Sequence, residues 1–120
     1  MRIKNVDIMI KYELFSELYD QALKYNDCDM YIAECSMQDW TDEIEGGSVL
    51  PDMLAYIFMF SHMTLKEMRA TLKLTFNAFS KVYSVPSRTV QDWEYEKSKT
   101  PMYMKKLVAY TMLVDNFLDK

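Results

Sequence analysis

The sequence predicts an all-α fold, and three features of its 120 residues support this prediction. Half of the residues are hydrophobic, which is enough to form a buried core. Only two glycines and three prolines are present, so few positions interrupt a helix. Leu, Met, Lys and Glu, which all favour helices, are plentiful. The chain is therefore expected to form a helical bundle.

The first strong helical pattern covers residues 8–26. Apolar residues recur there at spacings of three and four, as on one face of an amphipathic helix, at Leu14, Phe15, Leu18, Tyr19, Ala22 and Tyr25. Residues 26–29 carry side chains that suit a turn and a helix N-cap. A short helix through residues 31–33 is expected to follow.

A second short helix is expected after residues 36–39, which resemble a helix cap, and it would carry Trp40 and Ile44. Residues 46–48, Gly-Gly-Ser, form the only loop of flexible composition. Pro51 then begins a helix that is apolar around much of its circumference. This helix is expected to lie buried where the two halves of the chain meet.

Four further helices are predicted in the second half of the chain. Thr64 and Glu67 form a capping box, and the helix that follows has Leu65, Met68 and Leu72 on its inner face. Thr75 opens a helix bearing Phe79 and Val82, and residues 84–86 end it. Ser87 begins a helix through Val90 and Trp93. Pro101 begins a long last helix, in which the residues expected to face inward are Tyr103, Leu107, Tyr110, Leu113 and Phe117.

Charge divides the chain into an acidic half and a basic half. Residues 1–60 contain four basic and twelve acidic residues, a net charge of −8. Residues 61–120 contain ten basic and six acidic residues, a net charge of +4. The overall charge of −4 therefore averages two different surfaces, and the basic half is compatible with a nucleic-acid partner.

The sequence contains no pattern that predicts catalysis or metal binding. Cys28 and Cys35 lack metal-ligand spacing and are expected to be free thiols. The acidic residues around Asp27 lack the glycine and alternating oxygen ligands of a calcium loop. His62 has no neighbouring nucleophile. We therefore expect a protein that is not an enzyme and that has no catalytic residue, metal or cofactor.

Two segments resemble the λ-repressor-like, or XRE-type, helix-turn-helix family. The first is residues 75–94, TFNAFSKVYSVPSRTVQDWE, and the second is residues 97–103, KSKTPMY. The resemblance extends over about residues 63–115. It implies a helix-turn-helix DNA-binding domain at residues 63–120, with an acidic helical region at residues 1–62 packed on it.

The resemblance also implies which residues would contact DNA. Val90 and Trp93 would hold the second helix of the motif to the core, and the base-reading positions would be Ser87, Arg88, Gln91 and Asp92. Arginine can pair bidentately with guanine, and aspartate can accept a hydrogen bond from cytosine. The residues expected to neutralise phosphates are Lys81, Lys97, Lys99, Lys105 and Lys106.

Two residues depart from the family pattern. Phe76 stands where the family commonly has a glutamine that contacts phosphate, so this contact is expected to be absent. Glu96 stands where a glycine often allows the chain to turn, and its charge would face DNA unfavourably. These departures concern the affinity for DNA and not the fold.

The function expected from the sequence is sequence-specific binding of double-stranded DNA by a cytoplasmic bacterial or phage transcription regulator. A homodimer is expected, because such domains usually pair across two half-sites. No membrane association is expected, because the longest apolar stretch, residues 53–60, is too short to span a bilayer. The alternative is a protein-binding inhibitor, such as an antitoxin or an anti-CRISPR protein. It would use an acidic patch made of Asp39, Trp40, Asp42, Glu43 and Glu45.

Overall fold

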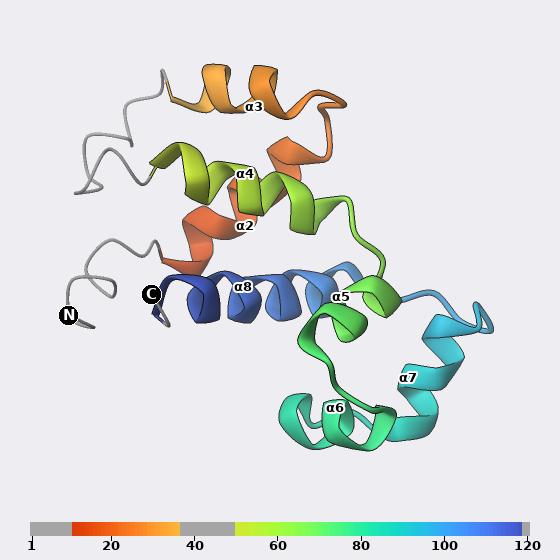
Figure 1. Cartoon of the computed structure of the whole chain (residues 1–120). Coiled ribbons are helices and arrows are strands. Elements are labelled where there is room, and N and C mark those ends of the chain that lie inside the picture. The colour runs from red at the N-terminus through yellow and green to blue at the C-terminus, as the bar shows by residue number, and fades with distance from the viewer. Residues whose placement is uncertain (1–10, 37–49, 119–120) are drawn as a thin grey trace.

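The computed structural model describes residues 11–36 and 50–118, and side chains up to Asp115 (Figure 1). All regular elements within these ranges are α-helices, which confirms the all-α prediction. In chain order they are α2 (Tyr12–Ala22), α3 (Cys28–Cys35), α4 (Leu50–Ser61), α5 (Leu65–Leu72), α6 (Phe76–Tyr83), α7 (Ser87–Glu94) and α8 (Met102–Leu118). No helix in the described ranges has both the length and the apolar character needed to cross a membrane.

The helices form two lobes that share α8. We call α2, α3 and α4 the N-terminal lobe, and α5, α6 and α7 the C-terminal lobe. Helix α8 runs between them and packs against α2, α4 and α5 (Figure 1). The molecule measures 43 × 33 × 20 Å along its principal axes. One helix therefore contributes to the packing of both lobes.

Aromatic and aliphatic side chains build the N-terminal lobe around the middle of α8. Phe15 of α2 and Ile57 of α4 are fully buried, as is Val108 of α8. The ring of Tyr110 lies 5.1 Å from that of Phe15 and 5.3 Å from that of Tyr12. Burial of side chains of this size contributes about 1.5–3 kcal/mol each. The prediction that the helix after Pro51 would be buried between the two halves is consistent with its contacts to α2, α3 and α8.

Side-chain caps begin several helices as the sequence predicts. The Glu67 amide donates to Thr64 Oγ1 at 3.1 Å, and the Thr64 amide donates to Glu67 Oε1 at 2.8 Å, so the capping box is confirmed. Thr75 Oγ1 accepts from the Ala78 amide at 3.1 Å and starts α6. Each cap satisfies backbone amides that the first turn of a helix leaves without partners.

The three helices of the C-terminal lobe are followed by residues with positive φ. Lys73 (φ 60°) follows α5, Ser84 (φ 56°) follows α6 and Glu96 (φ 61°) lies just beyond α7. Glycine is the usual residue in this left-handed region, because a Cβ atom costs about 1–2 kcal/mol there. Glu96 thus adopts the backbone conformation for which the family pattern has a glycine.

The first predicted helix is shorter than expected at its C-terminal end. It was expected over residues 8–26, but α2 ends at Ala22, and residues 8–10 lie outside the described ranges. The amides of Lys24 and Tyr25 bond to carbonyls three residues back, which tightens the chain into a turn. Tyr25 is therefore outside the helix, and its hydroxyl donates to Glu34 at 2.8 Å.

The inward face of α8 was predicted correctly only in part: Leu113 is buried and Tyr110 packs against the core, as expected. Tyr103 and Leu107 were expected to face the core, but 64% and 43% of their surfaces are exposed. Met104 and Val108, each one position later, are buried instead. Most positions of this helix are apolar, so the sequence pattern does not identify which stripe packs inward.

Of the two apolar residues singled out on α6, Phe79 is buried and Val82 is exposed. Helix α6 has only eight residues and one fully buried position.

The helix expected around Trp40 and Ile44, the loop at residues 46–48 and the acidic patch at residues 39–45 lie outside the described ranges. The same applies to the side chain of Phe117.

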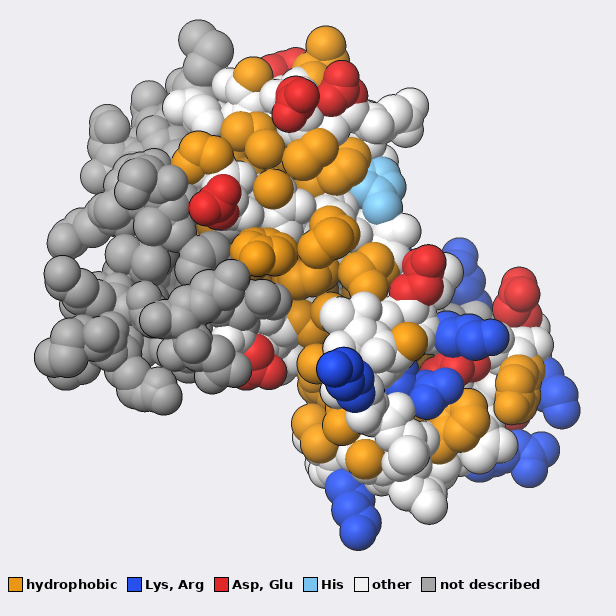
Figure 2. Space-filling view, viewed as in Figure 1, with side chains coloured by type: hydrophobic (Ala, Val, Ile, Leu, Met, Phe, Trp, Pro, Cys, Tyr) orange, Lys and Arg blue, Asp and Glu red, His pale blue; other side chains and the backbone are white. Residues whose placement is uncertain are grey.

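The charge division of the sequence is also a division in space. In Figure 2, Lys and Arg side chains lie on the C-terminal lobe, while the N-terminal lobe shows acidic and apolar side chains. The basic residues on α5 to α7 and the loop after them are Lys66, Arg69, Lys73, Lys81, Arg88, Lys97 and Lys99. A polyanion would therefore meet a favourable surface at one end of the molecule.

Candidate functional site

Helix α7 has one face held to the protein and one face turned outward. Val90 is fully buried and Trp93 is half-buried on the inner face. On the outer face, the side chain of Arg88 is 78% exposed, in the first turn of the helix. Ser87, Gln91 and Asp92 are half-buried. The four predicted base-reading residues therefore all lie on α7, and Arg88 projects farthest into solvent.

Arg88 is paired with Asp92 one turn further along α7. Its Nε donates to Asp92 Oδ1 at 3.2 Å, and both side chains retain access to solvent. An exposed pair four residues apart stabilises a helix by only about 0.3–0.5 kcal/mol. The guanidinium group can therefore leave Asp92 at little cost when a better acceptor is present.

The end of α7 is fixed by a pair that the sequence analysis missed. Arg69 of α5 donates through both Nε and Nη2 to the carboxylate of Glu94, the latter bond measuring 2.9 Å, and its Nη1 donates to the Leu74 carbonyl at 2.9 Å. The Glu94 side chain is only 2% exposed, and this partner raises the pKa of Arg69. Arg69 also lies 4.1 Å above the ring of Phe76. A polar pair 25 residues apart in the sequence gives no local signal that could have revealed it.

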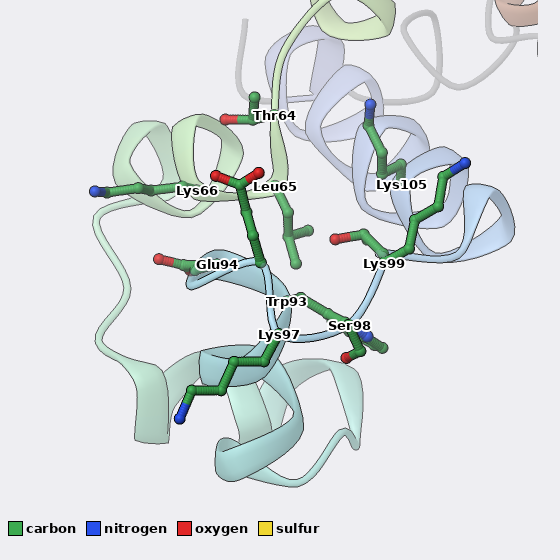
Figure 3. Close-up of a pocket in the computed structure, with 11 residues that line it drawn as sticks. Thr64, Leu65, Lys66, Trp93, Glu94, Lys97, Ser98, Lys99 and Lys105 are labelled. Atoms are coloured by element: carbon green, nitrogen blue, oxygen red, sulfur yellow. The ribbon is translucent and has the colours of Figure 1, made fainter.

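An open groove lies beside the end of α7. Its walls come from the start of α5, the end of α7, the loop at residues 95–100 and the first turns of α8, and Leu65 and Trp93 supply its apolar surface. Thr64, Ser98 and Thr100 add hydroxyl groups. Four lysines line the groove (Figure 3): Lys66, Lys97, Lys99 and Lys105.

The predicted phosphate-binding lysines do not all gather in this groove. The groove brings together Lys97, Lys99 and Lys105, and adds Lys66, which the sequence analysis did not single out. Lys81 is exposed on α6 and does not line the groove. Lys106 points to the N-terminal lobe, where its Nζ donates to Ser16 Oγ at 2.8 Å and lies 3.0 Å from Asp20 Oδ1. Lys106 thus joins α8 to α2 and does not line the groove.

Other reactive residues form no second centre in the described part of the chain. Cys28 and Cys35 are free, as predicted, and burial raises the pKa of both thiols. Residues 11–36 and 50–118 contain no cluster of His, Cys, Asp and Glu that could hold a metal ion. His62 Nε2 lies 3.1 Å from the carbonyl oxygen of Ala22, at the end of α2. The chain matches no protein-family model, no curated protein and no solved structure.

Proposed function

We propose that the protein is a sequence-specific DNA-binding regulator of bacterial or phage type, and that α6 and α7 form a λ-repressor-like helix-turn-helix. The observation that carries this proposal is the two-sided environment of α7. Its inner face is held by Val90, Trp93 and the Arg69–Glu94 pair, while Arg88 extends from its first turn. The acidic N-terminal lobe packs on this unit through α8.

The dimensions and side chains of α7 suit the major groove of DNA. An eight-residue helix is about 12 Å long and 10–12 Å wide, and the major groove is about 12 Å wide. Recognition helices of this kind contact bases mainly through their N-terminal residues. Arg88 lies in that position and can donate two hydrogen bonds to guanine O6 and N7. Ser87, Gln91 and Asp92 supply further donors and acceptors on the same helix.

Lysines near α7 would contribute to the affinity for DNA but not to the sequence specificity. Lys97 and Lys99 are exposed in the loop that follows α7, and Lys81 is exposed on α6. Each lysine that neutralises a phosphate releases a counterion, so binding weakens as the salt concentration rises. The two groups of residues should therefore respond differently to mutation.

The test compares Arg88→Ala with Lys97→Ala. A preferred duplex is first selected from random sequences, and binding to it and to random duplex is measured by fluorescence anisotropy at several salt concentrations. Arg88→Ala should lose about 1–3 kcal/mol on the preferred duplex and much less on random duplex. Lys97→Ala should weaken both alike and lower the salt slope by about one.

Two outcomes would count against this proposal. Equal losses on both duplexes for Arg88→Ala would reject base reading by Arg88, because a lost charge acts on all sequences alike. No binding of the wild-type protein to either duplex at low salt would reject DNA binding as a whole. That result would favour the alternative of a protein-binding inhibitor.

A further inference from the structure

The lysines of the groove beside α7 are spread over two sides of it. In Figure 3, Lys99 and Lys105 extend toward one side of the groove, whereas Lys66 and Lys97 extend toward the other. The lysines on each side come from different elements: the loop after α7 contributes one lysine to each side, and α5 or α8 contributes the other. Folding thus brings together positive charges that are up to 39 residues apart in the sequence, from Lys66 to Lys105.

Lys105 is the member of this set with the least favourable surroundings for its charge. It is half-buried, and desolvation lowers its pKa, an effect that the charge of Glu67 only partly opposes. No carboxylate in the described part of the chain lies within ion-pairing distance of its Nζ. A partly desolvated ammonium group without a counter-ion is stabilised when an anion binds beside it.

The two carboxylates of the groove do not cancel its positive charge. Glu94 is already bound by Arg69 and is almost fully buried. Glu96 lines the groove and forms no ion pair within the described ranges. Among the lining residues, Glu96 is therefore the carboxylate without an ion pair, while Glu67 acts on Lys105 from outside the lining. Glu96 would compete with an incoming anion for the four lysines.

We infer that this groove binds a linear run of phosphate groups, with Lys99 and Lys105 contacting one end of the run and Lys66 and Lys97 the other. Lysines on both sides of an open groove match a chain of phosphates better than a single phosphate ion. The run has two chemical sources, the phosphodiester backbone of DNA and a free polyphosphate. The first source rests on the proposed function, and it would extend the DNA contact beyond α7 to α5 and α8.

The experiment uses the full chain and three ligands: a random DNA duplex, tripolyphosphate and inorganic phosphate. Binding is measured by isothermal titration for Lys66→Gln, Lys105→Gln, Lys105→Arg and Glu96→Gln. Lys73→Gln is the matched control, because Lys73 is an exposed lysine of the same lobe outside the groove. Thermal unfolding of each variant verifies that the fold is intact. Lys66→Gln changes only an exposed side chain, so it tests the groove even if Lys105→Gln alters packing.

Lys66→Gln and Lys105→Gln should each weaken binding of the occupying ligand by about three- to tenfold, because each removes one charge contact. If the duplex is that ligand, each should also lower the salt slope by about one. Lys105→Arg should restore binding, Glu96→Gln should strengthen it about threefold, and Lys73→Gln should change it less than twofold. Inorganic phosphate should bind more weakly than tripolyphosphate.

The outcomes separate this inference from the proposed function. Unchanged binding of both duplex and tripolyphosphate by Lys66→Gln and Lys105→Gln would overturn the inference, even if Arg88→Ala still reduced DNA binding. Lysine-dependent binding of tripolyphosphate without any duplex binding would support the groove and overturn the DNA-binding function. If Lys73→Gln weakened binding as much as the groove variants do, the groove inference would also be overturned, because the loss would reflect a general charge effect.

Discussion

At the scale of single residues, Tyr19 places a polar hydroxyl group in the hydrophobic core. Its side chain is fully buried, and its hydroxyl has no hydrogen-bond partner among the described residues. Burial, with a smaller contribution from the Asp20 charge, raises the pKa of Tyr19 to about 12. Tyr31, which is equally buried, differs because its hydroxyl donates to the Leu18 carbonyl at 2.9 Å. The two tyrosines therefore form a natural comparison.

We predict opposite effects of Tyr19→Phe and Tyr31→Phe on stability at pH 8. Tyr19→Phe removes a hydroxyl without a partner, so the free energy of unfolding should stay the same or rise by up to about 1 kcal/mol. Tyr31→Phe removes a hydrogen bond and should lower it by about 1 kcal/mol. Urea denaturation followed by circular dichroism measures both. A loss for Tyr19→Phe as large as that for Tyr31→Phe would contradict the prediction.

The same Tyr19 variant has a defined pH dependence. The unfolded state releases the tyrosine proton near pH 10, whereas the folded state retains it up to about pH 12. Between these values the folded state binds more protons, so the stability of the wild-type protein falls as the pH rises. Tyr19→Phe removes this term, and its stability should fall less steeply between pH 10 and 12. If the stability of Tyr19→Phe and of the wild-type protein fell equally steeply between pH 10 and 12, the raised pKa of Tyr19 would be contradicted.

At the scale of elements, the Arg69–Glu94 pair is the link between α5 and α7. We predict that Glu94→Gln lowers the free energy of unfolding by about 2–4 kcal/mol, because it leaves the Arg69 guanidinium without its counter-charge. The double variant Arg69→Met with Glu94→Leu removes both charges and should be destabilised less than Glu94→Gln alone. Urea denaturation of Arg69→Met, Glu94→Leu and the double variant gives the coupling energy between the two residues. Additive losses would show that the pair acts as two independent side chains.

Local signals in the sequence located most elements of the C-terminal lobe. Thr64 with Glu67, and Thr75, are caps whose partners lie within three residues, so their role is visible in the sequence. Local spacing also explains why Val90 was correctly assigned to the core. The break before Ser87 was visible for a similar reason, since Pro86 cannot continue a helix.

Features that depend on distant residues could not be read from the sequence. The inward face of α8 is selected by contacts with α2, α4 and α5, and its nearly uniform apolar composition hides that choice. Lys106 was grouped with the other basic residues, although Asp20, 86 positions earlier, is its partner. Lys66 enters the groove only because α5 and α8 pack together. Tertiary packing, and not local preference, decides all three.

At the scale of the whole molecule, residues 63–120 do not form an independent packing unit, because α8 also packs against helices of residues 1–62. Val108, Ala109, Met112 and Leu113 are buried on this helix, which packs against α2 and α4 as well as α5. Removing the N-terminal lobe would expose much of this surface to water. Each such side chain contributes about 1–3 kcal/mol when buried, depending on its size.

We therefore predict that a fragment of residues 63–120 is less stable than the full chain by on the order of 5 kcal/mol. Thermal unfolding followed by circular dichroism should show a much lower midpoint for the fragment and a single transition for the full chain. The full chain with Lys106→Gln is a useful control, because it removes one polar link between α8 and the N-terminal lobe and leaves the apolar contacts in place. Equal midpoints for the fragment and the full chain would contradict a shared core.

The placement of acidic side chains on one lobe and basic side chains on the other gives the molecule a permanent electric moment along the line that joins the lobes. Near a polyanion, such a moment produces a torque that turns the basic lobe forward before any contact forms. The molecule would then arrive with α7 and the groove leading and the acidic lobe trailing. Rapid, oriented encounter at low ionic strength follows from this arrangement, and salt above about 0.1 M suppresses it because the screening length falls below about 10 Å.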